Sequence, residues 1–388
     1  MLRLREYASS EVELEEHDLH HLLALVRGEG EGDEAKVIQS ITPTSKPNTY
    51  RVKPGAFVGR IGLPSGESLD VESRFPIGDV VDMLRFSGRL PIRLDRLAPA
   101  MDEEMFFLDV IALAFAREVE RLVSFGLAKG YRLYRFDRPP YPGSPDIQIH
   151  LGRYAARPDK LVTRARRITV DIDLNRALVA AIEVLSRVSL TIEPTKALRS
   201  VYPAFGRTRR VPTPASALGR IELTSLTSRY REGLGLAEII LRGQSLAPEG
   251  DPIAGASVLF NMPKVWEACV ARWAEMEWPE YDIVDQHSFG VTADGSLRAS
   301  ADVTVWDSGK LMALYDAKYK WPGDTPALSD VYQMVAYCTR LGINEATLVY
   351  PARAKQKSYA VGDTTIHTLG LDIESLLAAG GGLTKAVA

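Results

Sequence analysis

Two aspartates and a lysine near the C-terminal end of the chain have the residue types and spacing of a hydrolytic metal site. Asp302 lies in one apolar run, and Asp316 and Lys318 close the next run as an Asp-x-Lys sequence. Residues 307–310, Asp-Ser-Gly-Lys, favour a tight turn between the two runs. Since side chains alternate along a strand, Asp316 and Lys318 project to one side, and the turn brings Asp302 within about one residue of facing Asp316. The sequence therefore predicts a hairpin on which two carboxylates and one ammonium converge.

Such a set fits metal-assisted hydrolysis of a phosphodiester. The reaction needs a nucleophilic water, neutralisation of the charge that grows on the phosphoryl oxygens, and stabilisation of the leaving oxygen, and a divalent metal can serve all three. Mg²⁺ prefers oxygen ligands and keeps several waters, so Asp302 and Asp316 with one carbonyl suffice. The carbonyl of Ala317 is the natural third ligand, and Mn²⁺ can substitute for Mg²⁺. Lys318 would orient the attacking water, and metal proximity with burial should lower its pKa.

Two flanking helices offer further groups to this site. Apolar residues recur at helical spacing from Leu259 onward, which places Glu267 beside the apolar seam. From there its carboxylate could reach the same metal or a second one. Gln333 lies in a helix predicted over 330–341, with Tyr337 on the same side. We expect Glu267 and Gln333 to assist the three central residues.

The Asp-x-Lys sequence alone is a weak signal, because it occurs often and usually marks a solvated strand edge. Here Leu311, Leu314 and Tyr315 make the strand apolar. Burying Asp316 and Lys318 in such a strand without a function would be costly. The context therefore favours a site over a solvated edge.

Composition indicates a folded protein of more than one domain. The chain has 388 residues, of which 46% are hydrophobic and 25% charged, and roughly 150 residues is typical of one domain. No apolar run reaches the roughly 18 residues of a membrane span, and the charged N-terminus lacks the apolar core of a signal peptide. Cys269 and Cys338 fall in apolar helical patterns, which favours reduced, buried thiols and a cytoplasmic location.

The formal net charge of −3 limits non-specific affinity for DNA. A protein that grips DNA alone usually carries a basic excess, so contact with phosphates would have to come from local patches. The candidate patches are Arg153, Arg157, Lys160, Arg164, Arg166 and Arg167, with a second group at Arg207, Arg209 and Arg210. Each patch could instead be a solvated face or a contact with a partner protein.

The order of the patterns predicts an α/β protein, α+β overall, in three parts. Residues 1–98 form a β-rich domain, 99–247 a helical or mixed connecting region, and 248–388 a mixed sheet flanked by helices. The stretch 246–252 is the expected linker, and the polar stretch 42–48 an exposed loop or projecting finger. Strands are expected over 50–53, 56–63, 68–72, 131–136 and 345–350, and helices over 77–86, 105–125, 174–188 and 234–241.

Segments of the sequence, in one order, carry a resemblance to a known family. They run from Leu259 to Glu267, Ala301 to Val303, Asp316 to Lys320 and Asp330 to Tyr337, with 58–61, 72–76 and 171–178 upstream. This order resembles McrC, the PD-(D/E)xK endonuclease subunit of McrBC-type modification-dependent restriction systems. The likeness covers most of the chain. Ala301 stands where the family usually has proline, a change outside the ligand set.

The resemblance implies a partner and a substrate. In the family, McrB is an AAA+ GTPase that forms a hexameric ring, recognises cytosine-modified double-stranded DNA and drives translocation. McrC docks its N-terminal domain into that ring, stimulates GTP hydrolysis and cuts. In this chain the stretch 42–53 fits such a docking finger. The chain has no Gly-x-x-x-x-Gly-Lys-Ser/Thr sequence, so we expect the partner, and not this chain, to bind the nucleotide.

The resulting expectation is a Mg²⁺-dependent endonuclease subunit that is silent or weak until it assembles with a GTPase ring. Asp302, Asp316, the Ala317 carbonyl and Glu267 are the expected metal ligands, and Lys318 and Gln333 complete the catalytic set. One alternative is a non-catalytic adaptor that only activates the partner, against which the intact Asp302, Asp316 and Lys318 count. The other is a stand-alone nuclease, against which the large N-terminal region and the mildly acidic charge count.

Overall fold

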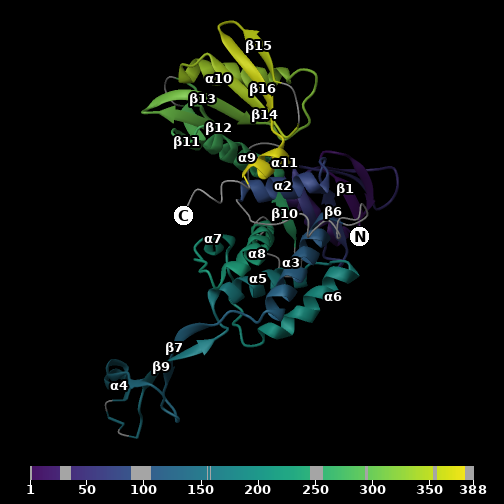
Figure 1. Cartoon of the computed structure of the whole chain (residues 1–388). Coiled ribbons are helices and arrows are strands. Elements are labelled where there is room, and N and C mark those ends of the chain that lie inside the picture. Colours follow the sequence, from purple (N-terminus) through teal and green to yellow (C-terminus); the bar gives the residue numbers. More distant parts are fainter. Residues whose placement is uncertain are drawn as a thin grey trace. The chain divides into compact units, whose positions relative to one another are not determined.

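The computed structural model divides the chain into two compact units. It describes residues 2–26, 36–88, 106–154, 156–157, 159–244, 257–292, 296–352 and 356–380. The first unit joins Met1–Leu108 with Gly243–Ala388, and the second is Asp109–Arg242 (Figure 1). The predicted linker at 246–252 and both predicted domain boundaries lie outside the described residues. None of the described helices has the length and apolar character needed to cross a membrane.

The N-terminal part of the first unit is rich in strands, as predicted. Its elements are β1 (Leu2–Arg5), β2 (Ser10–Glu13), α1 (Glu16–Val26), β3 (Ile38–Pro43), β4 (Thr49–Pro54), β5 (Phe57–Gly62), β6 (Ser68–Glu72) and α2 (Ile77–Ser87). They form one sheet of order β2-β4-β3 and contribute to a second of order β1-β6-β5-β10, in which β10 is Val258–Asn261. Leu22, Ile38, Val52, Ile61 and Leu69 are fully buried between them.

The predicted finger at 42–53 is mostly a β-hairpin. Residues 42–43 end β3 and residues 49–53 belong to β4, so only 44–48 form a loop. The Thr44 hydroxyl donates to the carbonyl of Thr49 at 2.9 Å and closes this loop. The exposed loop predicted over 42–48 is therefore confirmed for 44–48. The loop expected to continue over 49–53 is wrong, because backbone pairing with β2 and β3 makes that stretch strand β4.

The C-terminal part of the first unit is a mixed sheet with helices on it. Its elements are β10 (Val258–Asn261), α9 (Met262–Glu277), β11 (Asp282–Gly290), β12 (Arg298–Asp307), β13 (Lys310–Ala317), α10 (Leu328–Leu341), β14 (Glu345–Tyr350), β15 (Lys357–Val361), β16 (Thr364–Gly370) and α11 (Ile373–Gly380). The sheet order is β11-β12-β13-β14-β16-β15, with β13, β14 and β16 parallel. The mixed α+β class predicted from the sequence is confirmed.

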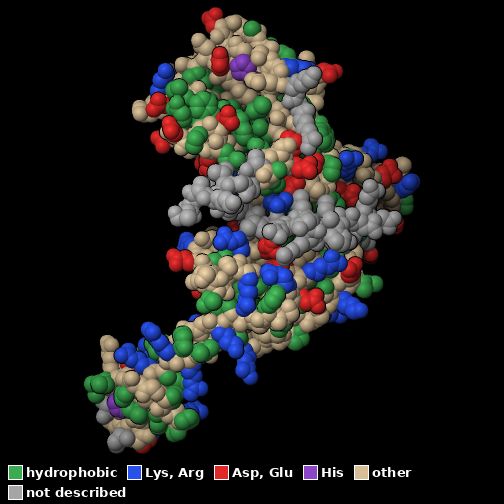
Figure 2. Space-filling view, in the orientation of Figure 1, with side chains coloured by type: hydrophobic (Ala, Val, Ile, Leu, Met, Phe, Trp, Pro, Cys, Tyr) green, Lys and Arg blue, Asp and Glu red, His purple; other side chains and the backbone are tan. Residues whose placement is uncertain are grey.

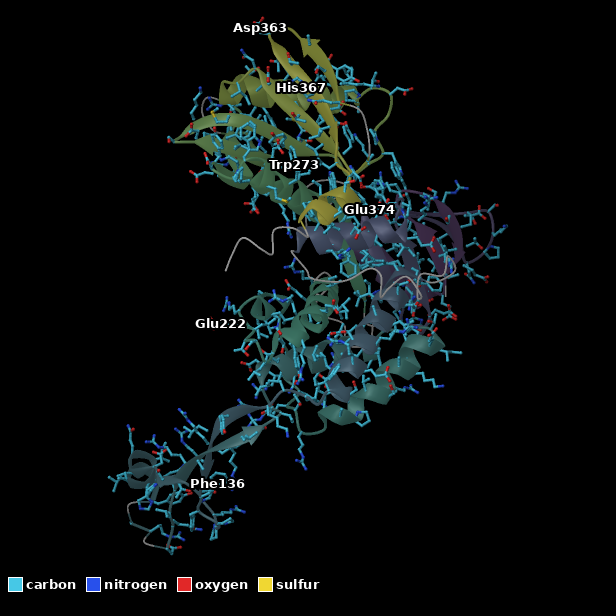
Figure 3. The ribbon with its side chains drawn as sticks, in the orientation of Figure 1. Phe136, Glu222, Trp273, Asp363, His367 and Glu374 are labelled. Carbon is cyan, nitrogen blue, oxygen red and sulfur yellow. The ribbon has the colours of Figure 1, made fainter. Side chains whose placement is uncertain are left out.

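Helices pack on both faces of this sheet. Neighbouring residues of β13 point to opposite sides and contact a different helix on each side. Leu314 joins the core beneath α10, with Val331 and Met334. The next residue, Tyr315, meets Trp273 edge-on, with ring centroids 5.0 Å apart. Trp273 lies on α9 (Figure 3). Both faces are therefore apolar along most of β13, and a charged residue in this strand requires a specific use.

The start of α9 departs from the sequence prediction. Val258–Asn261 is a strand, so the predicted helical run from Leu259 begins as β10. Asn261 caps the helix by accepting a hydrogen bond from Lys264 N at 3.2 Å. β10 pairs with β5, and a Cβ atom added to Gly59 would lie 2.2 Å from the Val258 carbonyl oxygen. Glycine at 59 thus permits the close approach that ties the N-terminal strands to the element before α9.

The second unit is mainly helical. Its elements are α3 (Phe107–Ser124), β7 (Gly130–Phe136), β8 (Ser144–Pro145), α4 (Ile147–Tyr154), β9 (Thr163–Thr169), α5 (Asp173–Arg187), α6 (Ile192–Val201), α7 (Ala215–Leu218), α8 (Arg231–Gln244) and the single turns Tyr202–Phe205 and Ser228–Tyr230. Its core contains a polar link, because the buried Tyr230 hydroxyl donates to Asn175 at 2.8 Å and accepts from Ala128 N at 2.7 Å. The helices predicted over 105–125, 174–188 and 234–241 are confirmed within the described residues as α3, α5 and α8.

Residues 130–169 of the second unit form an arm that extends away from its helices (Figure 1). β7 and β9 pair along their whole length, and α4 lies at the far end. At the base of the arm, the buried Asp171 pairs with Arg132, Arg176 and Arg209. Figure 2 shows that lysine and arginine side chains gather on the arm, which contains all six residues of the first predicted basic patch.

Candidate active site

The hairpin of β12 and β13 brings the three central residues together. In the turn, Ser308 and Gly309 have φ of 50° and 86°, which suits a tight hairpin. The pairing shifts by one residue between Val305 and Trp306, and beyond this bulge Val303 faces Tyr315. The next positions along the two strands are Asp302 and Asp316. The bulge therefore removes the one-residue offset that the turn alone would leave between the two aspartates.

Short contacts join these residues. Lys318 Nζ lies 2.7 Å from Asp316 Oδ2 and donates to Gln333 Oε1 at 3.2 Å. The backbone N–H of Ala317 donates to Asp302 Oδ2 at 2.8 Å. Asp316 is 3% exposed in total, although it lies at the end of its strand. Asp302, Asp316, Lys318 and Gln333 thus form one cluster, and Tyr337 accompanies it because Gln333 Nε2 donates to its hydroxyl at 3.0 Å.

Glu267 lies beside this cluster through a residue that the sequence did not single out. Gln286 Nε2 donates to Glu267 Oε2 at 2.7 Å and to Asp302 Oδ1 at 3.4 Å. The pairing of β11 with β12 is interrupted at Gln286 and Asp302, with the same register on both sides of the interruption. Gln286 has a φ of 51°, a strained value for a residue with a side chain. Glu267 also accepts from Lys264 Nζ at 2.7 Å. The Gln286 amide therefore lies within hydrogen-bonding distance of both carboxylates.

Asp330 and Lys320 also belong to the cluster. Lys320 Nζ lies 2.5 Å from Asp330 Oδ2, and Lys318 Nζ lies 3.7 Å from Asp330 Oδ1. Asp330 occupies the first turn of α10, where a carboxylate also interacts favourably with the helix dipole. The sequence signals available for these two residues were the spacing Asp316-x-Lys318-x-Lys320 and the position of Asp330 three residues before Gln333.

The electrostatics of the cluster favour an added cation. Burial, the Asp316 carboxylate and Glu267 raise the pKa of Asp302 to about 7. Burial also raises the pKa of Asp316, while Lys318 opposes that shift. Two neighbouring carboxyl groups with raised pKa values are typical of a cation site, because a bound cation would favour the ionised form of both.

The lowering of the Lys318 pKa predicted beside a bound metal stays a prediction, and in the metal-free protein the pKa shifts the other way. Burial lowers the pKa, but the nearby Asp316, Asp330 and Asp302 carboxylates raise it by more, so the pKa lies above its usual value. The closest of these carboxylates, Asp316, lies 2.7 Å from Lys318 Nζ. Lys318 is therefore a charged donor at neutral pH.

The donor set fits one divalent cation held by few protein ligands. Among the described residues, no group of three or more His, Cys, Asp or Glu side chains has metal-binding geometry. Asp302 and Asp316 would therefore hold Mg²⁺ with the Ala317 carbonyl and water, a set compatible with the preference of Mg²⁺ for oxygen ligands and retained waters. Glu267 is held by Lys264 and Gln286, so it would assist from beside the metal ligands without binding the metal directly.

The raised pKa of Asp302 predicts a pH-dependent metal affinity. Since a cation binds the ionised carboxylate, its affinity should rise by up to about tenfold per pH unit below the carboxyl pKa of about 7 and level off above it. Titration calorimetry of Mg²⁺ or Mn²⁺ into the full chain at several pH values measures this. The Asp302→Asn variant should lose the pH dependence with most of the affinity.

The same shift has a consequence for the metal-free protein. A folded-state pKa above the unfolded value means that the folded state holds the proton more tightly. The contribution of Asp302 to stability is therefore greatest below the ordinary carboxyl pKa and declines as pH rises toward about 7. In the metal titration, an affinity for Mg²⁺ or Mn²⁺ that is equal below and above pH 7 would show that Asp302 is not a metal ligand.

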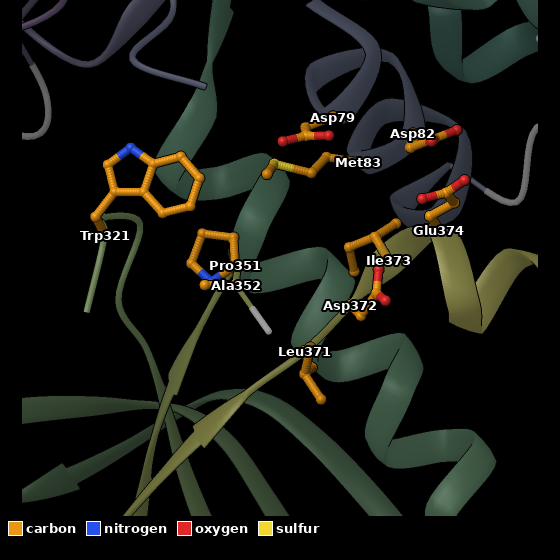
Figure 4. A pocket seen from close by; sticks show the side chains of 10 residues that line it. All are labelled: Asp79, Asp82, Met83, Trp321, Pro351, Ala352, Leu371, Asp372, Ile373 and Glu374. Atoms are coloured by element: carbon orange, nitrogen blue, oxygen red, sulfur yellow. The ribbon is translucent and has the colours of Figure 1, made fainter. Parts of the chain in front are cut away.

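A separate cavity of about 360 Å³ lies between α2 and α11 in the first unit (Figure 4). Asp79, Asp82 and Glu374 line it together with Trp321. Its carboxylates have local partners, since Arg85 Nη1 donates to Asp82 at 2.7 Å. None of the predicted site residues lines this cavity, so the hairpin cluster remains the candidate site.

The comparison with solved structures finds the same fold over nearly the full length. One match is a chain of the "refined half-complex from tetradecameric assembly of Thermococcus gammatolerans McrB AAA+ hexamers with bound McrC". The TM-score is 0.65 at 13% identity, with 99% of each chain covered. A second is a chain of the cryo-EM structure of the Thermococcus gammatolerans McrBC complex, with a TM-score of 0.48, 14% identity, and 72% of this chain and 89% of that chain covered. No curated protein sequence matches the chain.

The sequence itself matches one family model, described as the McrBC 5-methylcytosine restriction system component, over residues 52–351. This range contains all five predicted catalytic residues and the whole second unit. It also spans most of the chain, as the resemblance to McrC predicted. The chain therefore belongs to the family of McrBC 5-methylcytosine restriction system components.

Proposed function

We propose that this chain is the Mg²⁺-dependent DNA endonuclease subunit of a McrBC-type restriction system. In this proposal it cuts phosphodiesters when assembled with an AAA+ GTPase ring, whose GTP hydrolysis it stimulates. The observation that carries the proposal is the convergence of Asp302, Asp316 and Lys318 at the end of an apolar hairpin, where burial and like charge raise the pKa of both aspartates. A PD-(D/E)xK nuclease requires that set of groups.

Each group has a role that its contacts support. A bound Mg²⁺ would polarise the phosphate and lower the pKa of a water. Lys318 remains charged because Asp316 holds its ammonium at 2.7 Å, so it would orient the attacking water by hydrogen bonding and stabilise charge on the phosphoryl oxygens. Gln333 Oε1, at 3.2 Å from Nζ, would fix the direction of that ammonium. These interactions together orient one donor toward the reacting phosphate.

The arm is the candidate surface for the ring, in place of the 42–53 stretch. One face of its hairpin presents Tyr131 beside Ile168, Leu133 beside Arg166, and Arg135 beside Arg164. Tyr131, Leu133 and Ile168 are 72%, 55% and 60% exposed. The sheet of the arm consists of β7, β9 and the two-residue β8, and exposed apolar residues next to arginines are typical of protein interfaces.

The second predicted basic group is less available for such a contact. Arg209 pairs with Asp171 and Arg210 with Glu183, at 3.4 Å and 3.3 Å. In the first group, Arg157 pairs with Asp159 at 2.8 Å. The arginines of β9 are therefore the stronger candidates for a partner contact.

The arm predicts a separation of functions. Replacing Leu133 and Ile168 by serine should weaken binding of the ring by about 10-fold or more, because central apolar contacts carry most interface energy. Binding is measured by biolayer interferometry with the assembled partner. Folding should persist, since both side chains are solvent-exposed. A matched control is Leu328→Ser, an equally exposed leucine at 63% at the start of α10 in the first unit.

The comparisons support the same partner and substrate class. The similar solved structure is described as McrB AAA+ hexamers with bound McrC, and the family is described by 5-methylcytosine restriction. We therefore propose a McrB-like AAA+ ring as the partner and double-stranded DNA with modified cytosine as the substrate. The formal net charge of −3 agrees with DNA being delivered by a partner.

One reconstitution tests the proposal. The full chain is incubated with methylated and unmethylated DNA and Mg²⁺, with and without the partner ring and GTP. Cleavage of methylated DNA only in the complete mixture is the expected result. Cleavage without the ring would favour a stand-alone nuclease. Stimulated GTPase without cleavage in any mixture would favour the adaptor.

A further inference from the structure

Tyr319 lies between the two lysines of the cluster in sequence, but its side chain points away from the cluster. The backbone makes a tight turn here, since Lys318 N donates to Val349 O at 2.8 Å and Lys320 N donates to Lys318 O at 2.8 Å. The side chains of Lys318 and Lys320 reach Asp316 and Asp330. The ring of Tyr319, only 7% exposed, packs instead against residues from the N-terminal part of the same unit.

The Tyr319 hydroxyl is held by two polar groups. It donates to Glu6 Oε2 at 3.3 Å and lies 2.9 Å from Ser73 Oγ. Its ring contacts Phe75, with centroids 5.0 Å apart, and Arg74 Cζ lies 5.4 Å from its centroid. Tyr319 and Glu6 are 313 positions apart along the chain. The residue next to Lys318 is therefore anchored outside the C-terminal sheet.

Glu6 is a costly residue to place at this point. Its side chain is 0% exposed. It accepts from Arg74 N at 3.0 Å and lies 3.6 Å from Arg74 Nε. A buried carboxylate that served only for packing could be replaced by an apolar side chain at little cost or with a gain in stability. A buried, directional hydrogen bond instead fixes one position of its partner.

We propose that Tyr319, held by Glu6 and Ser73, is a positioning residue that fixes Lys318 for catalysis. The N-terminal part of the chain thereby sets the geometry of the catalytic ammonium, although it contributes no group to the reacting centre. The inference rests on the proposed nuclease function. It follows from the chain geometry, because the tight turn from Lys318 to Lys320 transmits any movement of Tyr319 to both lysines.

Removing the hydroxyl of Tyr319 while keeping its aromatic ring tests this positioning role. In the full chain with partner ring and GTP, Tyr319→Phe and Glu6→Gln should each lower kcat for DNA cleavage by about 10- to 100-fold, because small displacements of catalytic groups have effects of this size. KM for DNA and stimulation of the GTPase should stay unchanged, since neither residue is placed at a DNA or ring contact.

The matched control is Tyr281→Phe, which removes a hydroxyl elsewhere in the same unit. Tyr281 immediately precedes β11, whose first residue Asp282 pairs with Trp306, four positions along β12 from Asp302. Its variant should cleave at the wild-type rate. Thermal unfolding of all variants shows whether a loss of kcat merely follows a loss of folded protein.

A background lacking the lysine distinguishes positioning from a general structural role. If Tyr319 acts through Lys318, Tyr319→Phe should not lower the residual cleavage of Lys318→Ala further, because the two effects share one path. Equal and additive losses in both backgrounds would overturn the inference, as would wild-type kcat in Tyr319→Phe and Glu6→Gln. Absence of cleavage by the wild-type chain in the complete mixture would instead overturn the proposed function itself.

Discussion

Replacing Asp316 by asparagine is expected to lower partner-dependent DNA cleavage by at least about 10²- to 10³-fold, the size of effect seen when one preorganised electrostatic group is removed. The amide keeps the shape of the side chain and removes its charge. Two functions are lost at once, since Asp316 is a proposed metal ligand and the closest acid to Lys318, at 2.7 Å. Stimulation of the partner GTPase should persist.

The same substitution should leave the folded state intact. Burial raises the pKa of Asp316 more than Lys318 lowers it, so the ionised carboxylate is an unfavourable group in the metal-free fold. A neutral isostere relieves this, and we expect the melting temperature to stay level or to rise. Loss of activity with retained stability is typical of a residue kept for function.

A matched control lies on the same hairpin. Asp307 is exposed in the turn between β12 and β13, so Asp307→Asn makes an identical chemical change without touching the cluster. It should cleave at the wild-type rate. Intact cleavage by Asp316→Asn would remove Asp316 from the site, and lost cleavage together with a large fall in melting temperature would indicate a structural role.

The part of the site that the sequence predicted is local in the chain. The hairpin followed from an apolar alternation interrupted by Asp-Ser-Gly-Lys, and the structure places Asp302, Asp316 and Lys318 together as expected. Gln333 could be predicted with them because the apolar residues of its helix recur at helical spacing and the helix follows the hairpin in sequence. Strand alternation and helical periodicity act over a few residues, so a single sequence is enough to read them.

The features that the sequence did not predict depend on distant or irregular pairing. Gln286 reaches Glu267 and Asp302 from an irregular backbone position with a φ of 51°, and no short-range pattern marks that position in β11. The bond between Tyr319 and Glu6 joins opposite ends of the chain. The sequence predicts only one strand and a basic patch in the arm, because the partner strand β9, with three arginines, lacks the alternation of a half-buried strand.

Replacing Asp70 by alanine is expected to lower the free energy of unfolding of the first unit by about 3–5 kcal/mol, the cost of breaking a buried ion pair by removing one partner. Arg60 and Asp70 face each other on β5 and β6, with Arg60 Nε 2.9 Å and 3.0 Å from the two carboxylate oxygens. Their side chains are 0% and 5% exposed. The Arg60 guanidinium would stay buried without the carboxylate that offsets its charge.

All five tryptophans lie between residues 266 and 321, so tryptophan fluorescence during urea unfolding reports on the first unit alone. A control is Glu11→Ala, whose carboxylate pairs with Lys46 and Arg51 at exposed positions and should cost about 1 kcal/mol or less.

The effect of Asp70→Ala should also reach the candidate site, because β5, which carries Arg60, pairs with β10, and β10 leads directly into α9. α9 carries Glu267 and the fully buried Trp266, whose indole donates to Val349 O at 3.0 Å. Val349 O in turn accepts from Lys318 N. A destabilised N-terminal sheet should therefore lower cleavage and fluorescence-detected stability together, whereas a fall in stability with unchanged cleavage at low temperature would show that the sheet and the cluster are independent.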